Sequence, residues 1–166
     1  EMGRIKEKVG HGFVPFVKVL VKACRGEGKR YVHYGVTTQN IQQTSQLYQA
    51  MQIHRIIKGF LGDILDNLSH LAEQHADAVM AGRTHGKHAI PITYGYKASV
   101  WISELLQTAV RLEECEKRVF VVMMGGAVGG SNATGEIGVR VQERVAEKLG
   151  MCSMDVPCRN MSQMKV

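Results

Sequence analysis

Two uninterrupted helical patterns constrain the fold more than any other feature of the sequence. The first runs from Thr38 to Asp77, a stretch that contains no proline and only the glycines Gly59 and Gly62. Residues recur there at intervals of three and four, the spacing that places side chains on one face of a helix. This row consists of Ile53, Ile57, Leu61, Ile64, Leu68, Leu71 and His75. A helix of about 38 residues would be about 57 Å long, with Thr37 or Thr38 as its N-cap.

The second pattern predicts a helix from about Thr93 to Val122. Its row has the same spacing, and only Glu116 interrupts the apolar character. The members are Ala98, Ile102, Leu105, Ala109, Leu112, Glu116, Val119 and Met123. Pro91 lies just before the expected start, where its missing N–H matters least. Shorter helices are predicted over Phe13–Cys24 and over Ile137–Leu149, with Gly150 as the residue that ends the latter.

No segment predicts a sheet, although Tyr31–Val36 could form a short extended segment. The expected fold class is therefore all-α, a bundle of long helices. The two long rows present more apolar surface than the two short helices can cover. We expect other subunits, or further chain, to cover the remainder.

Composition narrows the classes of partner. The net charge of +6 comes from 21 Lys and Arg against 15 Asp and Glu. These basic residues are scattered rather than gathered, so a small anionic substrate is favoured over nucleic acid. No apolar run approaches the ~18 residues that span a bilayer, which predicts no membrane partner. No signal peptide is visible and the four cysteines form no CxxC pair, so we expect a cytoplasmic protein in which Cys152 and Cys158 are free thiols.

Polar residues gather just before the first long helix, in the segment from Tyr31 to Asn40. An imidazole, two hydroxyls and two amides lie there, supplied by His33, Thr37, Thr38, Gln39 and Asn40. Unpaired N–H groups at a helix start bind carboxylates or phosphates. Capping by the threonines alone would be the simpler interpretation, but capping needs only one such residue.

A second polar group lies between the long helices, in Met80–His88. Its side chains are Arg83, Thr84, His85, Lys87 and His88. An imidazole between two fixed positive charges is suited to facing an anion and moving protons. His85 and His88 could be imagined as a metal pair. No metal is predicted, because the loop has no Asp, Glu or Cys ligand.

The third loop, Gly125–Gly135, contains five glycines in eleven residues. It lacks the GxGxxG and Walker A spacings of phosphate loops. We interpret it as a tight connection with close backbone approach. Ser131, Asn132 and Thr134 could still contact a ligand.

Three blocks taken together resemble one known superfamily. They are His33-Tyr-Gly-Val-Thr-Thr-Gln-Asn-Ile, Gly82-Arg-Thr-His-Gly-Lys-His-Ala-Ile-Pro and Gly126-Ala-Val-Gly. In order and spacing they are similar to blocks of the fumarase/aspartase superfamily, in the branch of adenylosuccinate lyase and 3-carboxy-cis,cis-muconate cycloisomerase. The resemblance covers about Val9 to Leu149. It implies an all-α homotetramer with active sites shared between subunits, without a cofactor. It also divides the chain into residues 1–36, the end of an N-terminal helical domain with a substrate loop, and 37–166, part of the central bundle.

The resemblance implies a lyase that eliminates a nitrogen or oxygen group from a succinyl substrate and releases fumarate, as in purine biosynthesis. His85 would be the general acid and Thr84 would hold a substrate carboxylate. Thr37 and Thr38 would bind the succinyl group, and His11 would bind a substrate phosphate or assist the acid. The remaining binding residues on this interpretation are His33, Gln39, Arg83 and Lys87.

Several positions depart from the adenylosuccinate lyase pattern. Asn40 stands in place of an aspartate, Gly10 and Gly12 flank His11 in place of arginine and aspartate, and Ile90 stands where glutamate is frequent. The segment from Phe13 to Lys18 looks more like the cycloisomerases, whereas His85 favours elimination. A cycloisomerase-like enzyme and a catalytically silent structural relative therefore stay open as alternatives.

Two parts of the family pattern are not found in this sequence. The serine-rich loop that supplies the family's base is not found, and neither is the N-terminal arginine-tyrosine segment. On this interpretation the chain is a fragment of a longer polypeptide and is inactive by itself. A helical scaffold that only mimics the three blocks is the remaining alternative.

Overall fold

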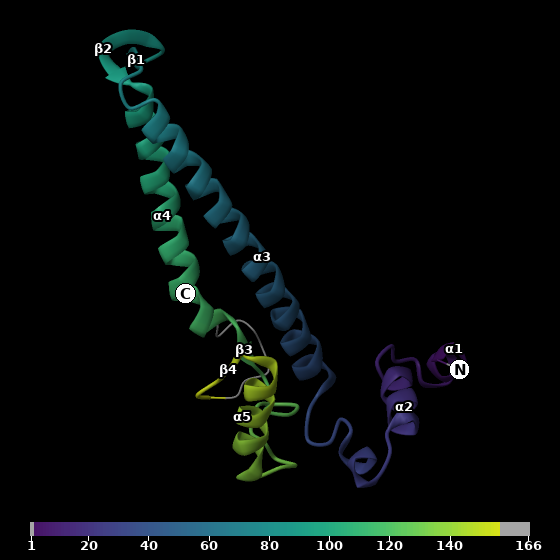
Figure 1. Cartoon of the computed structure of the whole chain (residues 1–166). Helices are drawn as coiled ribbons and strands as arrows, with labels where there is room; N and C mark the ends of the chain where they lie inside the picture. Colours follow the sequence, from purple (N-terminus) through teal and green to yellow (C-terminus); the bar gives the residue numbers. More distant parts are fainter. Residues whose placement is uncertain (1, 157–166) are drawn as a thin grey trace. The chain divides into compact units, whose positions relative to one another are not determined.

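A computed structural model of the chain describes residues 2–156, and these divide into two compact units. The first contains residues up to Tyr48 together with those from Arg118 onward, and the second is Gln49–Lys117. Helices dominate both units, which confirms the predicted class of long-helix, all-α fold (Figure 1). One helix, α3 (Thr38–Gln74), supplies residues to both units.

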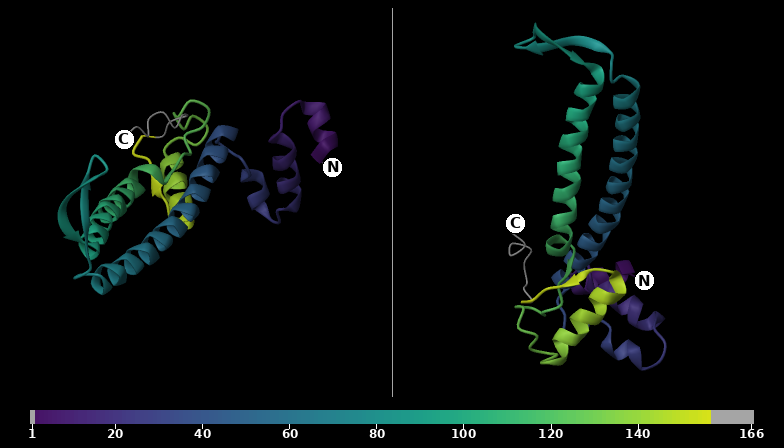
Figure 2. Two further views of the ribbon diagram at one scale, coloured as in Figure 1. Left: turned by 90° about the horizontal axis from the view of Figure 1, so that it is seen from above. Right: turned by 60° about the vertical axis from the view of Figure 1, so that its left-hand side comes forward.

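The second unit is a pair of long helices closed by a β-hairpin. Helix α4 (Tyr94–Val119) lies beside α3, as the views in Figures 1 and 2 both show. Strands β1 (Val79–Thr84) and β2 (Lys87–Thr93) join the two helices. Both helices therefore form where the sequence predicts them. Each is shorter at its C-terminal end, α3 by three residues relative to Asp77 and α4 by three relative to Val122.

The hairpin corrects the prediction that the chain contains no sheet. Its two-residue turn is His85-Gly86, with φ angles of 50° and 76°. Positive φ at both residues is the geometry of a type I′ turn, whose twist matches that of the flanking strands. Asn-Gly and Asp-Gly are the usual sequences of this turn. The pair His-Gly is not, so the sequence did not predict a hairpin here.

Gly82 is needed where the hairpin is irregular. The register pairs Ala81 with Pro91 and Arg83 with His88, so β2 carries one extra residue opposite Gly82. A side chain at Gly82 would place its Cβ 2.5 Å from the carbonyl oxygen of Ile90. Pro91 thus lies inside β2 rather than next to a helix start. The N-cap of α4 is Thr93, whose Oγ1 accepts a hydrogen bond from the Tyr96 N–H at 3.1 Å.

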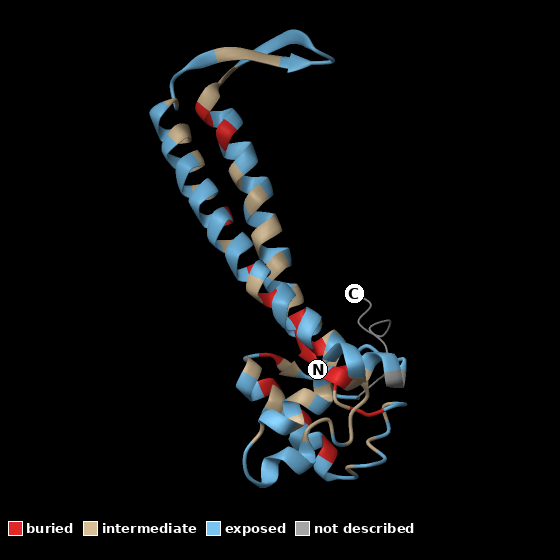
Figure 3. Cartoon of the chain, turned by 90° about the vertical axis from the view of Figure 1, so that its right-hand side faces the viewer, coloured by how far each residue is buried: buried red, intermediate tan, exposed pale blue. Residues whose placement is uncertain are grey.

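Burial along the two helices confirms one predicted row in full and the other in part. Every member of the α4 row, from Ala98 to Met123, is buried or half-buried. On α3, Ile53, Ile57 and Ile64 of the predicted row are exposed, whereas Leu61 is buried and Leu68, Leu71 and His75 are half-buried. Figure 3 shows how buried, half-buried and exposed positions alternate along both helices. Met51 and His54, which lie outside the predicted row, are buried as well, so the N-terminal part of this pairing uses a different and more polar row. Periodicity finds every apolar stripe on a helix but does not say which stripe meets the neighbouring helix.

This polar row explains why Glu116 interrupts the apolar pattern of α4. Glu116 Oε1 lies 2.9 Å from His54 Nε2 and 2.9 Å from Lys58 Nζ. Lys58 also reaches Glu113 Oε1 at 3.2 Å. The Lys58 hydrogen bond, followed by that of His54, lowers the pKa of Glu116. The hydrogen bonds that Lys58 donates to Glu116 and then to Glu113 raise the pKa of Lys58.

Replacing Glu116 with glutamine is expected to lower stability near neutral pH and to matter less in acid. The folded-state pKa of Glu116 lies below its ordinary value of 4.5. The carboxylate therefore stabilises the fold above about pH 5 and loses this effect as pH falls through the folded-state pKa. Urea midpoints of wild type and Glu116→Gln, measured from about pH 7 to about pH 3, should converge at the acid end. Glu114→Gln, an exposed neighbour on the same helix, is the control. A gap for Glu116→Gln that is equal at every pH would contradict the assignment.

The first unit contains short helices around the start of α3. Helix α1 (Met2–Val9), which the sequence analysis did not anticipate, precedes α2 (Val14–Ala23), which forms where expected. A 3₁₀ helix, η1 (Glu27–Tyr31), is followed by turns with positive φ at His33 and Gly35. The segment from Tyr31 to Val36 is thus not extended. Its backbone instead folds back sharply before Thr37.

The C-terminal half of this unit is a small βαβ arrangement. Strand β3 (Val121–Val122) pairs in parallel with β4 (Cys152–Ser153), and α5 (Ile137–Leu149) connects them. Val122 and Met123 are fully buried at its centre. The sequence predicts the bounds of α5 correctly, and Gly150 ends it in the left-handed conformation with φ of 64°.

Three further observations bear on the predicted partners. Among residues 2–156, no helix combines the length and apolarity needed to cross a bilayer. Within the same range no three His, Cys, Asp or Glu side chains are grouped as metal ligands would be. Cys24, Cys115 and Cys152 are free thiols, whereas Cys158 and the segment Met161–Val166 lie outside the described residues.

Candidate active site

The hairpin turn of the second unit presents the first group of candidate side chains. Arg83, Thr84, His85 and Lys87 are all exposed there. The turn brings them together because Thr84 pairs with Lys87 across it, with His85 between them. No described residue forms a hydrogen bond or ion pair with the His85 imidazole. A non-glycine residue with positive φ is uncommon and is enriched at functional sites.

A hydrogen bond across the strands orders the side chains next to this turn. Arg83 Nη2 lies 3.2 Å from His88 Nε2, and the two residues are partners in the register. Because a guanidinium can only donate, His88 Nε2 must be the acceptor. In this contact the Nε2 lone pair of His88 is occupied. This arrangement leaves His85 as the imidazole with both ring nitrogens available.

The second group lies at the start of α3, in the first unit. Helix α3 begins at Thr38, so Thr37 occupies the N-cap position, one of the two predicted for it. Thr37, Thr38 and Gln39 are all half-buried. The N–H groups of a helix's first turn have no partner within the helix, and the helix dipole adds partial positive charge there. This end of α3 is thus suited to receive a carboxylate.

His11 and His33 both contact Phe13, also within the first unit. The Phe13 N–H donates to His11 Nδ1 at 3.2 Å, and the Phe13 ring lies 5.5 Å from the ring of His33. His11 is exposed, whereas His33 is half-buried and held with φ of 62°. The His33 Nε2 atom is buried and has no hydrogen-bond partner among the described residues. His11 and His33, which lie 22 positions apart, thus contact the same residue.

Asn40 is a residue of this region to which the sequence assigns no role, although it is one of the two amides there and departs from the family pattern. Its side chain is fully buried, and Oδ1 accepts the Thr37 N–H at 3.1 Å. This is the return half of a capping box, in which the third helical residue reaches back to the N-cap. The four-residue pattern from Thr37 to Asn40 could have signalled it, although glutamate or glutamine is the usual third residue.

The predicted site residues thus form two groups rather than one within this chain. Thr37, Thr38, Gln39, His11 and His33 belong to the first unit, and Arg83, Thr84, His85 and Lys87 belong to the second. Each group offers cationic or N–H donors suited to an anion. The second group also offers a titratable imidazole that can transfer a proton.

Comparison with known proteins places the chain in a family. The family described as "Lyase" matches residues 3–165. Adenylosuccinate lyase of Methanothermobacter thermautotrophicus is 39% identical over 150 residues, which are 90% of this chain and 33% of that protein. N-acetyl-S-(2-succino)cysteine lyase of Dickeya dadantii is 33% identical over 151 residues, or 91% of this chain and 33% of that protein.

A solved structure supports the same placement. The crystal structure of 3-carboxy-cis,cis-muconate lactonizing enzyme from Pseudomonas putida superposes with a TM-score of 0.81 and 33% sequence identity. The match covers 94% of this chain and 36% of that one. The chain therefore spans about a third of the length of the curated relatives it matches. With the helical fold and the family match over nearly its whole length, the chain belongs to the lyase family of the fumarase/aspartase superfamily.

Proposed function

We propose that the gene product eliminates the β-substituent of a succinyl-type substrate and releases fumarate, as adenylosuccinate lyase does. The observation that carries this proposal is His85, an available imidazole at the tip of a hairpin turn, next to Arg83, Thr84 and Lys87. The similarity to an adenylosuccinate lyase and to a lyase of a succinylated cysteine supports it. Both names describe substrates that carry a succinyl group.

The fixed donors would hold the carboxylates of the substrate. Elimination by way of a carbanion places a second negative charge on a carboxylate, so the site needs several positioned donors with little water. Thr37 and Thr38, at the start of α3, are assigned to the succinyl group. Arg83, Thr84 and Lys87 are assigned to carboxylates at the hairpin, while His11, His33 and Gln39 complete the binding residues.

His85 would act as the general acid in bond cleavage. A base removes the proton from Cβ, and the electron pair forms the new double bond. The bond to the leaving nitrogen breaks, and that nitrogen takes a proton from His85. The resemblance assigns the base to a serine-rich loop, and no residue of this chain is proposed for that step. His85 then returns to its protonated form by exchange with solvent.

Fumarate release by the full-length gene product tests this function directly. Adenylosuccinate, argininosuccinate and N-acetyl-S-(2-succino)cysteine should be offered in turn while fumarate is measured by absorbance. We expect turnover of at least one of them, with adenylosuccinate the first choice. Absence of fumarate from all three would contradict the proposal and favour a silent relative.

A cycloisomerase is the second candidate, supported by the structural match to the muconate lactonizing enzyme. That activity would convert 3-carboxy-cis,cis-muconate to a lactone without fumarate. The same preparation should be tested with this compound. Lactone formation without fumarate release from the succinyl substrates would select the cycloisomerase.

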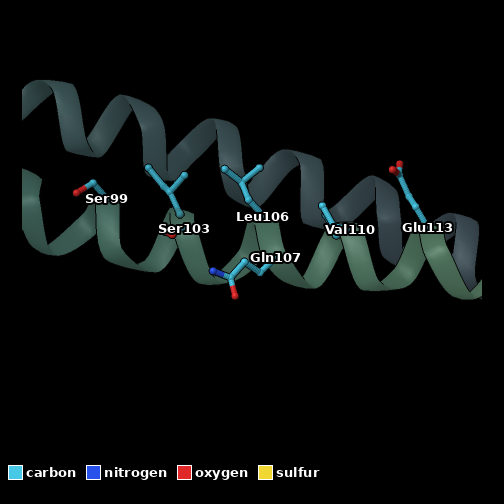
Figure 4. A pocket seen from close by; sticks show the side chains of 8 residues that line it. Ser99, Ser103, Leu106, Gln107, Val110 and Glu113 are labelled. Carbon is cyan, nitrogen blue, oxygen red and sulfur yellow. The ribbon is translucent and has the colours of Figure 1, made fainter. Parts of the chain in front are cut away.

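The exposed face of α3 leads us to propose that the protein assembles with copies of itself, as a homotetramer. Phe60 is 62% exposed and Ile57 is 48% exposed. On α4, Leu106 and Val110 border an open groove of about 610 Å³ whose lining comes from that helix alone (Figure 4). Large contiguous apolar surfaces of this kind mark interaction sites. Long helices that bury such faces against one another form bundles. Active sites shared between subunits would then unite residues from different copies.

A charge placed on the exposed face should dissociate the assembly without unfolding the chain. The Phe60 side chain is largely exposed within this chain. Phe60→Glu should therefore retain the helicity measured by circular dichroism. Sedimentation velocity should show a smaller species than wild type. Asn67→Glu, at an exposed polar position of the same helix, should leave the sedimentation coefficient unchanged. A wild-type protein that sediments as a stable monomer with intact helices would refute the proposed assembly.

A further inference from the structure

One buried amide joins two loops that are far apart in the sequence. Asn40 Oδ1 accepts the Gly126 N–H at 3.0 Å in addition to the Thr37 N–H at 3.1 Å. Both partners are donors, so the oxygen and nitrogen of the amide are assigned by the hydrogen bonds themselves. The Asn40 Nδ2 atom is buried and has no partner among the described residues. A single oxygen thus connects the start of α3 to the glycine-rich segment Gly125–Gly135.

The glycine-rich segment packs directly against the turns before α3. A Cβ on Gly35 would collide with Thr134 Cγ2, and one on Gly126 would lie 3.2 Å from the Gly35 carbonyl oxygen. Tyr34 Oη donates to the Ala133 carbonyl oxygen at 3.2 Å. This confirms the interpretation of the segment as a close-packed connection. Its contacts are with the turns before α3 and with the Asn40 side chain, next to Thr37 and Thr38.

Thr44, one helical turn after Asn40, fastens the chain just before this segment. Its Oγ1 accepts the Met123 N–H at 3.1 Å and donates to the Met123 carbonyl oxygen at 3.4 Å. Thr44 is buried, and neither of these hydrogen bonds involves Thr37. Thr44 is therefore a control for Asn40, because both bind the chain at or just before this segment but only Asn40 also binds the N-cap residue.

We propose that Asn40 is a positioning residue of the site, which sets Thr37 and Thr38 by tying the N-cap of α3 to the Gly126 peptide. This inference rests on the proposed function, in which those threonines bind the succinyl group. The acceptor oxygen carries the role, and the Nδ2 donor does not. An aspartate has the same acceptor in the same place, and it would be stabilised by the two N–H groups and the helix dipole. Asn40→Asp should therefore rescue what an apolar residue of similar size destroys.

The test compares Asn40→Leu, Asn40→Asp and Thr44→Val in the full-length gene product. Small displacements of positioning groups can cost about 100-fold in rate, so Asn40→Leu should lose about 10- to 100-fold in kcat/KM, mainly through KM. Asn40→Asp and Thr44→Val should stay within about threefold of wild type on the same scale, although Thr44→Val should unfold at a lower temperature. Asn40→Ser, with a shorter side chain, replaces the leucine variant if that one does not fold.

Amide hydrogen exchange provides a readout that does not depend on turnover. Asn40→Leu should remove protection from the Gly126 and Thr37 amides, and Asn40→Asp should preserve it. If wild type has no lyase activity, the proposed function fails while these amides still report on the Asn40 connection. Equal kinetic losses in Asn40→Leu and Thr44→Val would reduce Asn40 to a structural role and overturn the inference. Loss of activity in Asn40→Asp with protection retained would also overturn it, because the Nδ2 donor would then be the functional atom.

Discussion

Gly95→Ala is expected to destabilise the second unit by about 1–3 kcal/mol or more, the usual range for adding a methyl group to a filled site. Gly95 is the second residue of α4 and is buried. Its N–H donates to the His75 carbonyl oxygen at 2.9 Å. A Cβ at this position would lie 2.5 Å from the Ala72 carbonyl oxygen and 2.9 Å from Ala76 Cα. These are backbone atoms at the end of α3 and just after it. Unlike the end of a flexible side chain, they cannot relieve the clash by a change of rotamer.

The matched control is the same substitution at Gly62, in the middle of α3. No atom lies within 4 Å of a Cβ built there, so alanine should raise stability by about 0.5–1 kcal/mol through its helix propensity. Denaturant midpoints of both variants should therefore move in opposite directions from wild type. A Gly95→Ala protein as stable as Gly62→Ala would mean that α3 and α4 do not approach as described. A destabilising Gly62→Ala would instead show that another chain packs on that part of α3.

The sequence predicts the helices of this protein well because their signals are local. Helix α5 has a clear apolar periodicity and a glycine that ends it, so both of its bounds were correct. Helices α3 and α4 are long enough for their apolar periodicity to be clear. Only the positions of their C-terminal ends differ from the prediction. Helix α1 could not be predicted because four of its eight residues, Met2–Val9, are charged, and its few apolar residues are too short a row for a clear periodicity.

The contacts between elements were harder to predict because they depend on partners distant in sequence. At His54 and Lys58 the packed row of α3 is polar, so apolar periodicity does not mark it there. It is recognisable only once Glu116 of α4 is known to face it. The hairpin was missed for a related reason: the bulge at Gly82 breaks the alternation of side chains that would indicate strands.

The candidate site, too, could be predicted in its local features but not in its long-range contacts. The sequence identified His85 and its neighbours through their residue types, but not the type I′ turn that presents His85 at its tip. It identified the polar start of α3, yet it did not foresee the role of Asn40. That role needs Gly126, which lies 86 residues away. Roles that depend on one residue type in a local pattern can be predicted from sequence, whereas roles that depend on a distant backbone group cannot.

His85→Asn is expected to lower kcat by about 10²–10⁴, the range for removal of a general acid or base. Asparagine is the right replacement because His85 has a φ of 50° and precedes Gly86 with a φ of 76°. Asn-Gly is the most favoured pair for a type I′ turn, so the hairpin should be at least as stable as in wild type. Substrate affinity should change little, since Arg83 and Lys87 keep their charges. The kinetic constants of the full-length gene product, together with its melting temperature, measure both expectations.

His88→Gln is the control that separates the two imidazoles of this loop. The His88 Nε2 atom accepts from Arg83 Nη2 at 3.2 Å, and a glutamine oxygen can accept the same hydrogen bond. This variant should therefore keep Arg83 in place and lose less than about tenfold in kcat, below the range for removal of a general acid. The reverse pattern, a severe loss in His88→Gln and near-normal turnover in His85→Asn, would mean that His88 gives up its bond with Arg83 during the reaction. The assignment of His85 as the acid would then be wrong, although the fold and the family of the chain would stand.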